Sequence, residues 1–179
     1  MSERKRVSQT EKIYYAIGRR LENYPFSDNK KVKYLMFLVQ GYCLSKYNRF
    51  AFDDYIFVHK DDLRIPGREI HHRTGKYLLR YDLADYQDEA IDIVLKNILD
   101  VKEEELVNAI HKYPIIKEIH KRKWASWNPD WYQEIDYIEM MRFFKEHFDE
   151  YTKEEVIHPW KGMTQKEEQS RKFLALYRK

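Results

Sequence analysis

The chain has 179 residues and a mass of 22.1 kDa, a size that fits one domain with a core of its own. Its formal net charge of +3 is too small to indicate a nucleic-acid-binding protein, and its one cysteine, Cys43, excludes an intramolecular disulfide and a cysteine-based zinc cage. Aromatic residues make up 16% of the chain and are its unusual feature: they build a core economically, and some of them are candidates for exposed binding anchors.

The compartment is indicated by the start of the chain and by Cys43. The first residues are polar and basic, and no apolar stretch comes after them, so we expect no secretory signal. The longest apolar run, Tyr34 to Val39, is too short to cross a bilayer. Cys43 lies among apolar neighbours, where a buried inert thiol is favoured over a nucleophile. We therefore expect a protein of the cytoplasm that does not enter a membrane.

Helix signals dominate the first fifty residues. Ser8 and Glu11 have the spacing of a capping box. The helix after this box ends before Pro25, and its apolar positions at four-residue spacing are Ile13, Ile17 and Leu21. A second helix, capped by Ser27 or Asp28, is expected to reach about Tyr47. It is apolar almost all round, which predicts the central helix of the fold, surrounded by others.

Residues 50–81 have a different pattern. The segment 55–59 is rich in aromatic and β-branched residues, and the pairs Pro66-Gly67 and Thr74-Gly75 interrupt the remainder of the region. We expect one short β-hairpin here, or a long loop that carries a strand. This is the only β element that the sequence predicts.

Helical periodicity returns after residue 81. Two apolar faces precede Pro114, and they consist of Ala90, Ile91, Val94, Ile98 and Leu99, and of Leu106, Val107 and Ile110. The segment from Trp124 to Trp131 is expected to be an aromatic-rich loop, since it contains Pro129. A strong helix is expected from Asp136 to Phe148, and its apolar stripe is formed by Tyr137, Met140, Met141, Phe144 and Phe148.

The C-terminal end has a helix signal of its own. Thr164 and Glu167 form a second capping box, for a helix that ends near Tyr177. The segment 152–162 is the expected linker. We therefore expect one helical domain over residues 1–151, and over 152–179 a linker and a helix that packs on the domain or extends from it. The fold class is mainly α: a compact helical domain around a buried central helix, with a small β-hairpin or strand insertion.

The sequence carries no pattern that indicates an enzyme. Phosphate-binding glycine loops and the G-x-S-x-G elbow are absent, and the seven histidines form no metal-binding helical pair. Carboxylates are abundant, but nothing singles out two of them in a cleft. We therefore expect no catalytic residues, no cofactor and no metal, and a protein that acts by binding another macromolecule.

Two groups of residues are candidates for that binding. In the first, cations adjoin indoles, a combination that suits stacking on bases or insertion into a protein pocket; it consists of Lys121, Arg122, Lys123, Trp124, Trp127 and Trp131. Alternatively, its tryptophans dock on the core and its cations are solvated. The second is the acidic run of residues 82–105, represented by Asp88, Glu89 and Asp92, which either imitates a phosphate backbone or forms a solvated helix face.

The order of several motifs resembles the Panacea domain. The segment 33–42 is similar to the "K-L-Q-K-L-L-Y-x-A-Q-G" helix of that family, and Phe52-Asp53-Asp54 with Ile56 is similar to its "L-F-D-D-x-I" segment. Residues 105–114, together with Trp124, resemble its "L-S-x-L-T-H-x-E-x-P-W" stretch, and Glu134-Ile135 with the next helix resemble its closing motif. The similarity spans residues 32–148. It departs at residues 59–63, where the family has Tyr-Gly-Pro-Val.

The resemblance implies a helical domain with a small β element and no catalytic residues. It also implies a place in toxin–antitoxin systems and prophages, where such domains neutralise toxins by direct contact and one branch delivers the toxin to a protease. We therefore expect an antitoxin-like inhibitor whose partner is a protein, either a toxin or a defence effector. The alternatives are a phage- or prophage-encoded inhibitor of a host defence nuclease and a nucleic-acid-binding accessory protein.

Overall fold

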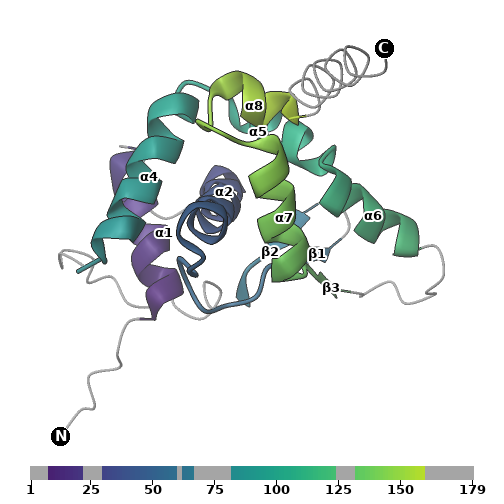
Figure 1. The fold of residues 1–179 in the computed structure, drawn as a ribbon, viewed down its shortest axis with the longest axis horizontal. Coiled ribbons are helices and arrows are strands. Elements are labelled where there is room, and N and C mark those ends of the chain that lie inside the picture. Colours follow the sequence, from purple (N-terminus) through teal and green to yellow (C-terminus); the bar gives the residue numbers. More distant parts are fainter. Residues whose placement is uncertain (1–7, 22–29, 60–61, 67–81, 124–131, 160–179) are drawn as a thin grey trace, which may run out of the picture.

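The central feature of the fold is α2 (Lys30–Tyr47), which other helices surround in a computed structural model of the chain (Figure 1). The structure describes residues 8–21, 30–59, 62–66, 82–123 and 132–159. The other helices are α1 (Gln9–Arg20), α4 (Asp85–Ile98), α5 (Glu103–His111), α6 (Pro114–Lys123), α7 (Tyr137–His147) and α8 (Lys153–Ile157). The strands are β1 (Phe57–His59), β2 (Asp62–Arg64) and β3 (Gln133–Glu134). The predicted fold class is confirmed.

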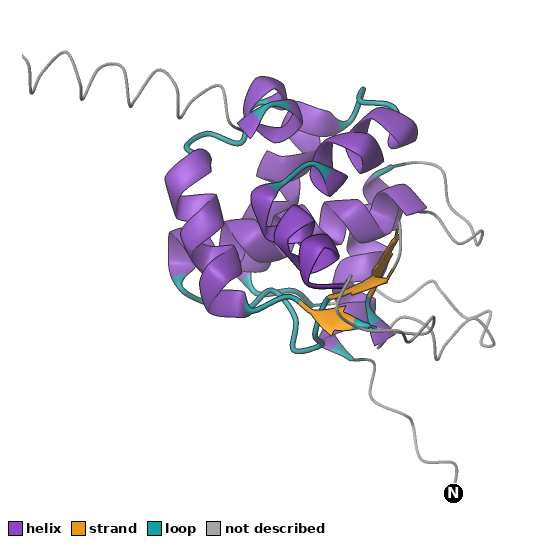
Figure 2. Ribbon diagram, turned by 90° about the vertical axis from the view of Figure 1, so that its right-hand side faces the viewer, coloured by secondary structure: helices purple, strands orange, loops and turns teal. Residues whose placement is uncertain are grey.

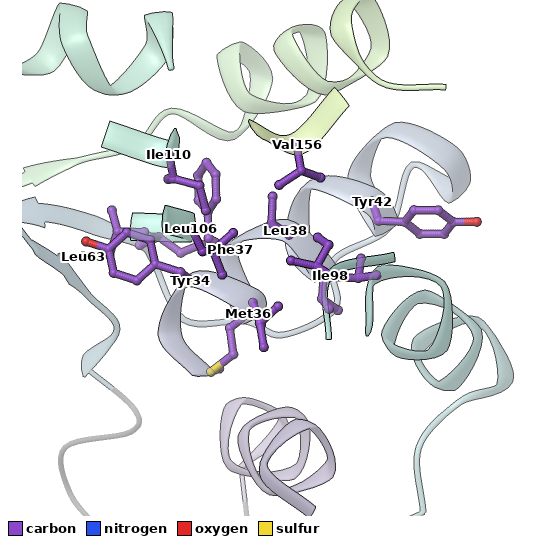
Figure 3. Packing of buried hydrophobic residues seen from close by; sticks show 14 of the residues in the cluster. Tyr34, Met36, Phe37, Leu38, Tyr42, Leu63, Ile98, Leu106, Ile110 and Val156 are labelled. Atoms are coloured by element: carbon purple, nitrogen blue, oxygen red, sulfur yellow. The ribbon is translucent and has the colours of Figure 1, made fainter. Parts of the chain in front are cut away.

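The buried position of α2 is explained by its apolar composition. Every residue from Val32 to Leu44 is buried, and α1, α4, α5 and α7 all pack against this helix. Figure 3 shows Phe37 and Leu38 of α2 among side chains from several of its neighbours. Burial of each large apolar side chain contributes about 1.5–3 kcal/mol, so this helix supplies much of the hydrophobic stabilisation. The expectation that it is the central helix is confirmed.

The first helix begins at the predicted cap. The Ser8 amide donates to Glu11 Oε2 at 2.7 Å, and the Glu11 amide donates to Ser8 Oγ at 3.2 Å. Such a pair of reciprocal bonds satisfies donors that the first turn leaves without a helical partner. The predicted apolar stripe of α1 is buried, with Ile13 and Ile17 fully enclosed. The proposed caps of α2, Ser27 and Asp28, lie outside the described residues.

The two apolar faces before Pro114 correspond to α4 and α5, with one exception. Ile98 is fully buried, but the Leu99 side chain is 53% exposed. Leu99 is the C-cap of α4, and it lies about 100° round the helix axis from Ile98, past the edge of the buried face. The remaining residues predicted for both faces are buried.

An additional helix, α6, comes after α5 and was not predicted. Pro114 is its first residue, where the missing amide proton costs nothing. Ile116 and Ile119, three residues apart, are buried, and α6 contacts both α5 and α7. The loop predicted for Trp124 to Trp131 lies outside the described residues.

Helix α7 packs closely on α2 because of a glycine. Asp136 caps α7 by accepting from the amides of Ile138 and Glu139 at 2.7 and 3.0 Å. A methyl group built on Gly41 of α2 would lie 2.4 Å from the Phe144 ring, so only glycine allows this approach. The predicted stripe is correct for the buried residues Met140, Phe144 and Phe148, and it omits the buried Phe143.

Part of the segment expected to be a linker is a helix, α8. Thr152 and Glu155 form its capping box, and Val156 and Ile157 are buried. The Tyr113 hydroxyl donates to the Val156 carbonyl at 2.6 Å, and α8 packs against α5. Val156 and Ile157 are therefore part of the core, while the helix expected from Thr164 lies outside the described residues.

The predicted hairpin consists of β1 and β2, and β3 completes an antiparallel sheet of order β2-β1-β3 (Figure 2). Val58 pairs with Leu63, and both side chains are buried toward the helices. Because successive side chains of a strand alternate between faces, Phe57 and His59 lie on the other face. Lys33 Nζ of α2 pairs with Asp62 Oδ2 at 2.5 Å and joins the sheet to the central helix.

No helix in the described part of the chain is long and apolar enough to cross a membrane.

Candidate protein-binding surface

A loop of residues 48–56 connects α2 to β1 and carries two exposed rings. Asn48 ends the helix with φ at 53°, in the left-handed region that asparagine tolerates better than most residues. The Arg49 amide then donates to the Cys43 carbonyl at 3.3 Å. From this point the chain runs across the ends of α4 and α7 instead of continuing the helix.

The loop is fixed from below by Gln40, a fully buried glutamine of α2. Its Oε1 accepts from the amides of Ala51 and Phe52 at 2.8 and 3.3 Å, and its Nε2 donates to the Phe52 carbonyl at 3.2 Å. One side chain thus satisfies three backbone groups that burial would otherwise leave without partners. A polar residue in an otherwise apolar helix is explained by this role.

The first turn of α4 fixes the same loop from one side. Gln87 is 2% exposed, and its Nε2 donates to the Ala51 carbonyl at 2.6 Å. Its Oε1 accepts from the Ala84 amide at 2.9 Å, which completes the cap of α4. The neighbouring Tyr86 hydroxyl donates to the Phe50 carbonyl at 2.8 Å. The loop backbone and the start of α4 therefore form one unit.

The first turn of α7 fixes the loop from the other side. The Tyr137 hydroxyl donates to the Asp54 carbonyl at 2.6 Å, and the Asp54 carboxylate accepts from the Thr10 hydroxyl of α1. Burial is the main cause that raises the pKa of Tyr137, and the nearby Glu134 carboxylate raises it further. The phenol therefore stays protonated as the donor of this bond at a higher pH than an ordinary tyrosine, whose pKa is about 10. Four helices in all hold the loop.

The loop presents its rings outward. Phe50 is 46% exposed and Tyr55 is 51% exposed. The Phe50 ring meets Tyr137 edge-on at 4.9 Å between centroids, and Tyr55 stacks on Tyr137 at 5.7 Å with an interplanar angle of 17°. Tyr55 also contacts the ring of Phe57, at 6.5 Å. We call these four rings, from Phe50, Tyr55, Phe57 and Tyr137, the aromatic surface.

The outer face of the sheet continues the aromatic surface. His59, two residues after Phe57 on the same face of β1, stacks on Tyr132 at 4.5 Å. The Arg64 guanidinium lies 4.7 Å from the centre of the Tyr132 ring and donates to its hydroxyl. Tyr132 is 43% exposed, so a second exposed ring group lies beside the first.

The basic group predicted as a binding site is only partly described. Lys121 lies on α6, is exposed, and pairs with Glu118 at 2.6 Å. Arg122 and Lys123 end the same helix. Trp124, Trp127 and Trp131 lie outside the described residues. Their role in binding stays a prediction.

The acidic residues predicted as a binding site lie on the exposed side of α4, but two of them have a cation as a partner. Arg20 of α1 pairs with Asp88 at 2.7 Å and with Asp92 at 2.9 Å. Glu89 lies beside Tyr47, whose pKa is raised first by burial and then by this carboxylate. Arg20 therefore neutralises part of the charge that a phosphate mimic would need.

Cys43 and the metal-binding side chains are the remaining candidates for chemistry in the described residues. Cys43 is buried, and burial raises the pKa of its thiol to about 12, so it is an inert core residue as predicted. Within the described ranges, no three of the side chains that bind metals gather in one place.

The aromatic surface was not predicted from the sequence. Tyr55 and Phe57 were assigned to a strand and Tyr137 to a buried stripe, and neither assignment says which rings are exposed. The signal that pointed to this region was the pair of Panacea-like motifs, Gln40-Gly41 and Phe52-Asp53-Asp54. Gln40 binds the backbone of the second motif directly.

No protein-family model matches the chain, and no curated protein or solved structure is similar to it. The resemblance of residues 32–148 to the Panacea domain is therefore carried by the order of its motifs. It stays a prediction.

Proposed function

We propose that this protein is an antitoxin that neutralises a partner toxin by direct protein–protein contact, and that the aromatic surface is the region of contact. The observation that carries the proposal is the fixed conformation of the loop that presents Phe50 and Tyr55. A loop already held in place loses little entropy on binding, which favours affinity. Exposed aromatic residues also dominate the binding energy of many interfaces.

The Panacea-like motifs support the same assignment. Gln40 belongs to the first motif and Phe52-Asp53-Asp54 to the second, and hydrogen bonds join the two. A chain that has both motifs therefore has the residues whose hydrogen bonds fix the loop. In this proposal the protein acts in the cytoplasm, from a toxin–antitoxin locus or a prophage.

The acidic face of α4 gives less support to inhibition of a defence nuclease by phosphate mimicry. Arg20 forms ion pairs with both Asp88 and Asp92. Replacing Asp88, Glu89 and Asp92 by lysine discriminates between the two functions. If circular dichroism shows this variant folded and Phe50→Ala/Tyr55→Ala still inhibits, loss of inhibition would favour the nuclease inhibitor. Retained inhibition would favour the aromatic surface.

The experiment that tests the proposal is coexpression with the product of each neighbouring gene. Growth rescue and copurification of the two proteins are the expected results. The double variant Phe50→Ala/Tyr55→Ala should bind at least about 30-fold more weakly, because residues that dominate an interface contribute about 2 kcal/mol or more.

Leu99→Ala is the matched control for this variant. Leu99 is an equally exposed large apolar residue, 53% accessible, at the opposite end of α4 from Tyr86. This control should keep full rescue. If no neighbouring gene product is toxic, or if coexpression rescues growth from none of them, the proposed function is wrong.

A further inference from the structure

The segments that meet at the aromatic surface are strongly acidic, although the whole chain carries a net charge of +3. They are the loop with its flanks (48–57), the start of α7 (132–139) and the start of α4 (82–89). Together they contain nine acidic residues and one basic residue, Arg49. A second cation, Arg64 of β2, pairs in register with Phe57 and lies over the Tyr132 ring. The hydrogen bonds of the loop to Tyr86, Gln87 and Tyr137 bring the three segments together.

Two of these carboxylates lie at the aromatic surface and are available to a partner. Asp53 comes after the buried Phe52 in the loop and is exposed. Glu134 is exposed and pairs across the sheet with Phe57. Neither takes part in an ion pair with any residue that the structure describes. By contrast, Asp54 and Asp136 are engaged with Thr10 and with the cap of α7.

We propose that the aromatic surface binds a basic protein surface, one in which lysine or arginine side chains flank an apolar centre. This inference rests on the proposed function and specifies the chemistry of the partner. A cation over the face of an exposed ring gains from the quadrupole of that ring. Asp53 and Glu134 each offer a carboxylate to cations of the partner, and such charge-assisted hydrogen bonds are stronger than neutral ones.

The local charge excludes a polyanion from the same surface. Carboxylates outnumber cations in these segments even though Arg20 pairs with Asp88 and Arg64 lies over Tyr132, so stacking of nucleic acid on the rings would be opposed by repulsion. A basic protein, such as one whose own ligand is a nucleic acid or a nucleotide, has the complementary charge. Complementary charge also accelerates encounter and fixes the partner's orientation.

A set of short peptides tests the partner chemistry without the toxin. The probe is the blocked peptide Arg-Arg-Leu-Arg-Arg, and its controls carry glutamine or glutamate in place of arginine. Binding to the full chain is monitored by chemical-shift changes of backbone amides. We expect the arginine peptide to shift the signals of Phe50, Asp53, Tyr55 and Glu134, and the control peptides to shift none of them.

The first turn of α5 is an internal control. Glu103, Glu104 and Glu105 are exposed carboxylates on α5. No ring of the aromatic surface belongs to α5, so these residues report attraction by charge alone. If the peptide shifts their signals as much as those at the aromatic surface, general charge attraction explains the binding and the inference is overturned. A single-stranded oligonucleotide that shifts the signals at Phe50 and Tyr55 would overturn it as well.

Matched charge reversals complete the test. Asp53→Lys/Glu134→Lys should reduce the affinity for the arginine peptide at least about tenfold, whereas Glu104→Lys should leave it within about twofold. Both variants change only exposed residues, and far-ultraviolet circular dichroism verifies their folding. Unchanged affinity of the first variant would overturn the inference.

The toxin assay separates this inference from the proposed function. If the wild-type chain rescues growth and Asp53→Lys/Glu134→Lys rescues it equally well, the antitoxin assignment holds and the basic partner is wrong. If the peptide binds at the aromatic surface but no neighbouring gene product is neutralised, the surface binds basic proteins and the antitoxin assignment is wrong.

Discussion

At the scale of single residues, Gln40 and Phe50 have opposite roles in the same loop. Gln40 is fully buried, and its side chain holds the loop backbone. Phe50 is 46% exposed, and its backbone, not its ring, makes the bond to Tyr86. One residue therefore determines whether the loop keeps its shape, and the other determines what the loop can bind.

Gln40→Leu should destabilise the protein by about 2–4 kcal/mol, because two amides and a carbonyl of the loop would lose their buried partner. Urea unfolding monitored by circular dichroism measures the change. Phe50→Ala should change the free energy of unfolding by less than about 1 kcal/mol, since its side chain is half-exposed. Equal losses of stability in the two variants would contradict this division of roles.

At the scale of elements, the packing of α7 on α2 depends on Gly41. Glycine in the middle of a helix normally costs about 1 kcal/mol relative to alanine. Here the Phe144 ring occupies the space that a methyl group would need. The close approach brings Phe144 into contact with Phe37 of α2 and Tyr151, at 5.5 and 5.9 Å between ring centroids.

Gly41→Ala should therefore destabilise the protein by about 1–3 kcal/mol, the usual cost of overpacking, although helix propensity alone would stabilise it. Thermal and urea unfolding give the sign directly. The double variant Gly41→Ala/Phe144→Leu should recover part of the loss, because the smaller side chain makes room for the methyl group. A stabilised single variant would show that the two helices move apart at no cost.

Elements with a strong local signal could be predicted from the sequence, and those defined by tertiary contacts could not. The box at Ser8 and Glu11 and the apolar length of α2 are local signals. Helix α8 has a capping box at Thr152 and Glu155, a local signal that the prediction missed, but its five residues are too few for a periodic pattern and it is stabilised by packing on α5. The exposure of Phe50 and Tyr55 depends on bonds to Gln87 and Tyr137, far away in the sequence.

At the scale of the whole molecule, the aromatic core makes the protein sensitive to alkali. Tyr113 and Tyr151 are fully buried, and burial raises the pKa of both phenols. Burial likewise raises the pKa of four further tyrosines, namely Tyr42, Tyr47, Tyr86 and Tyr137. Each of these phenols stays protonated in the folded protein at a pH at which it ionises in the unfolded chain.

The contribution of these tyrosines to the free energy of unfolding should consequently be level below the pKa of unfolded tyrosine, about 10, and fall as the pH rises above it. A group whose pKa is raised by folding contributes its full stabilisation below its unfolded pKa and loses it as the pH rises toward its folded pKa. The free energy of unfolding therefore decreases with rising pH in this range. Urea titrations across this range measure the decline. Absorbance of the phenolate should rise in a single step with unfolding for the two fully buried residues, Tyr113 and Tyr151. Gradual titration of these two in the folded protein would contradict the prediction.

The hydrogen bonds that hold the loop show which residues must be kept to preserve its conformation and which residues can be replaced. All the loop contacts with Gln40, Gln87 and the Tyr137 hydroxyl are made by backbone atoms of residues 50–54. Replacing the outward side chains of Phe50, Asp53 and Tyr55 therefore leaves those hydrogen bonds intact and removes only ring contacts at the surface. In evolution, a few substitutions at these positions would direct the same fold to a new partner, in the way that an antibody framework accepts new binding loops.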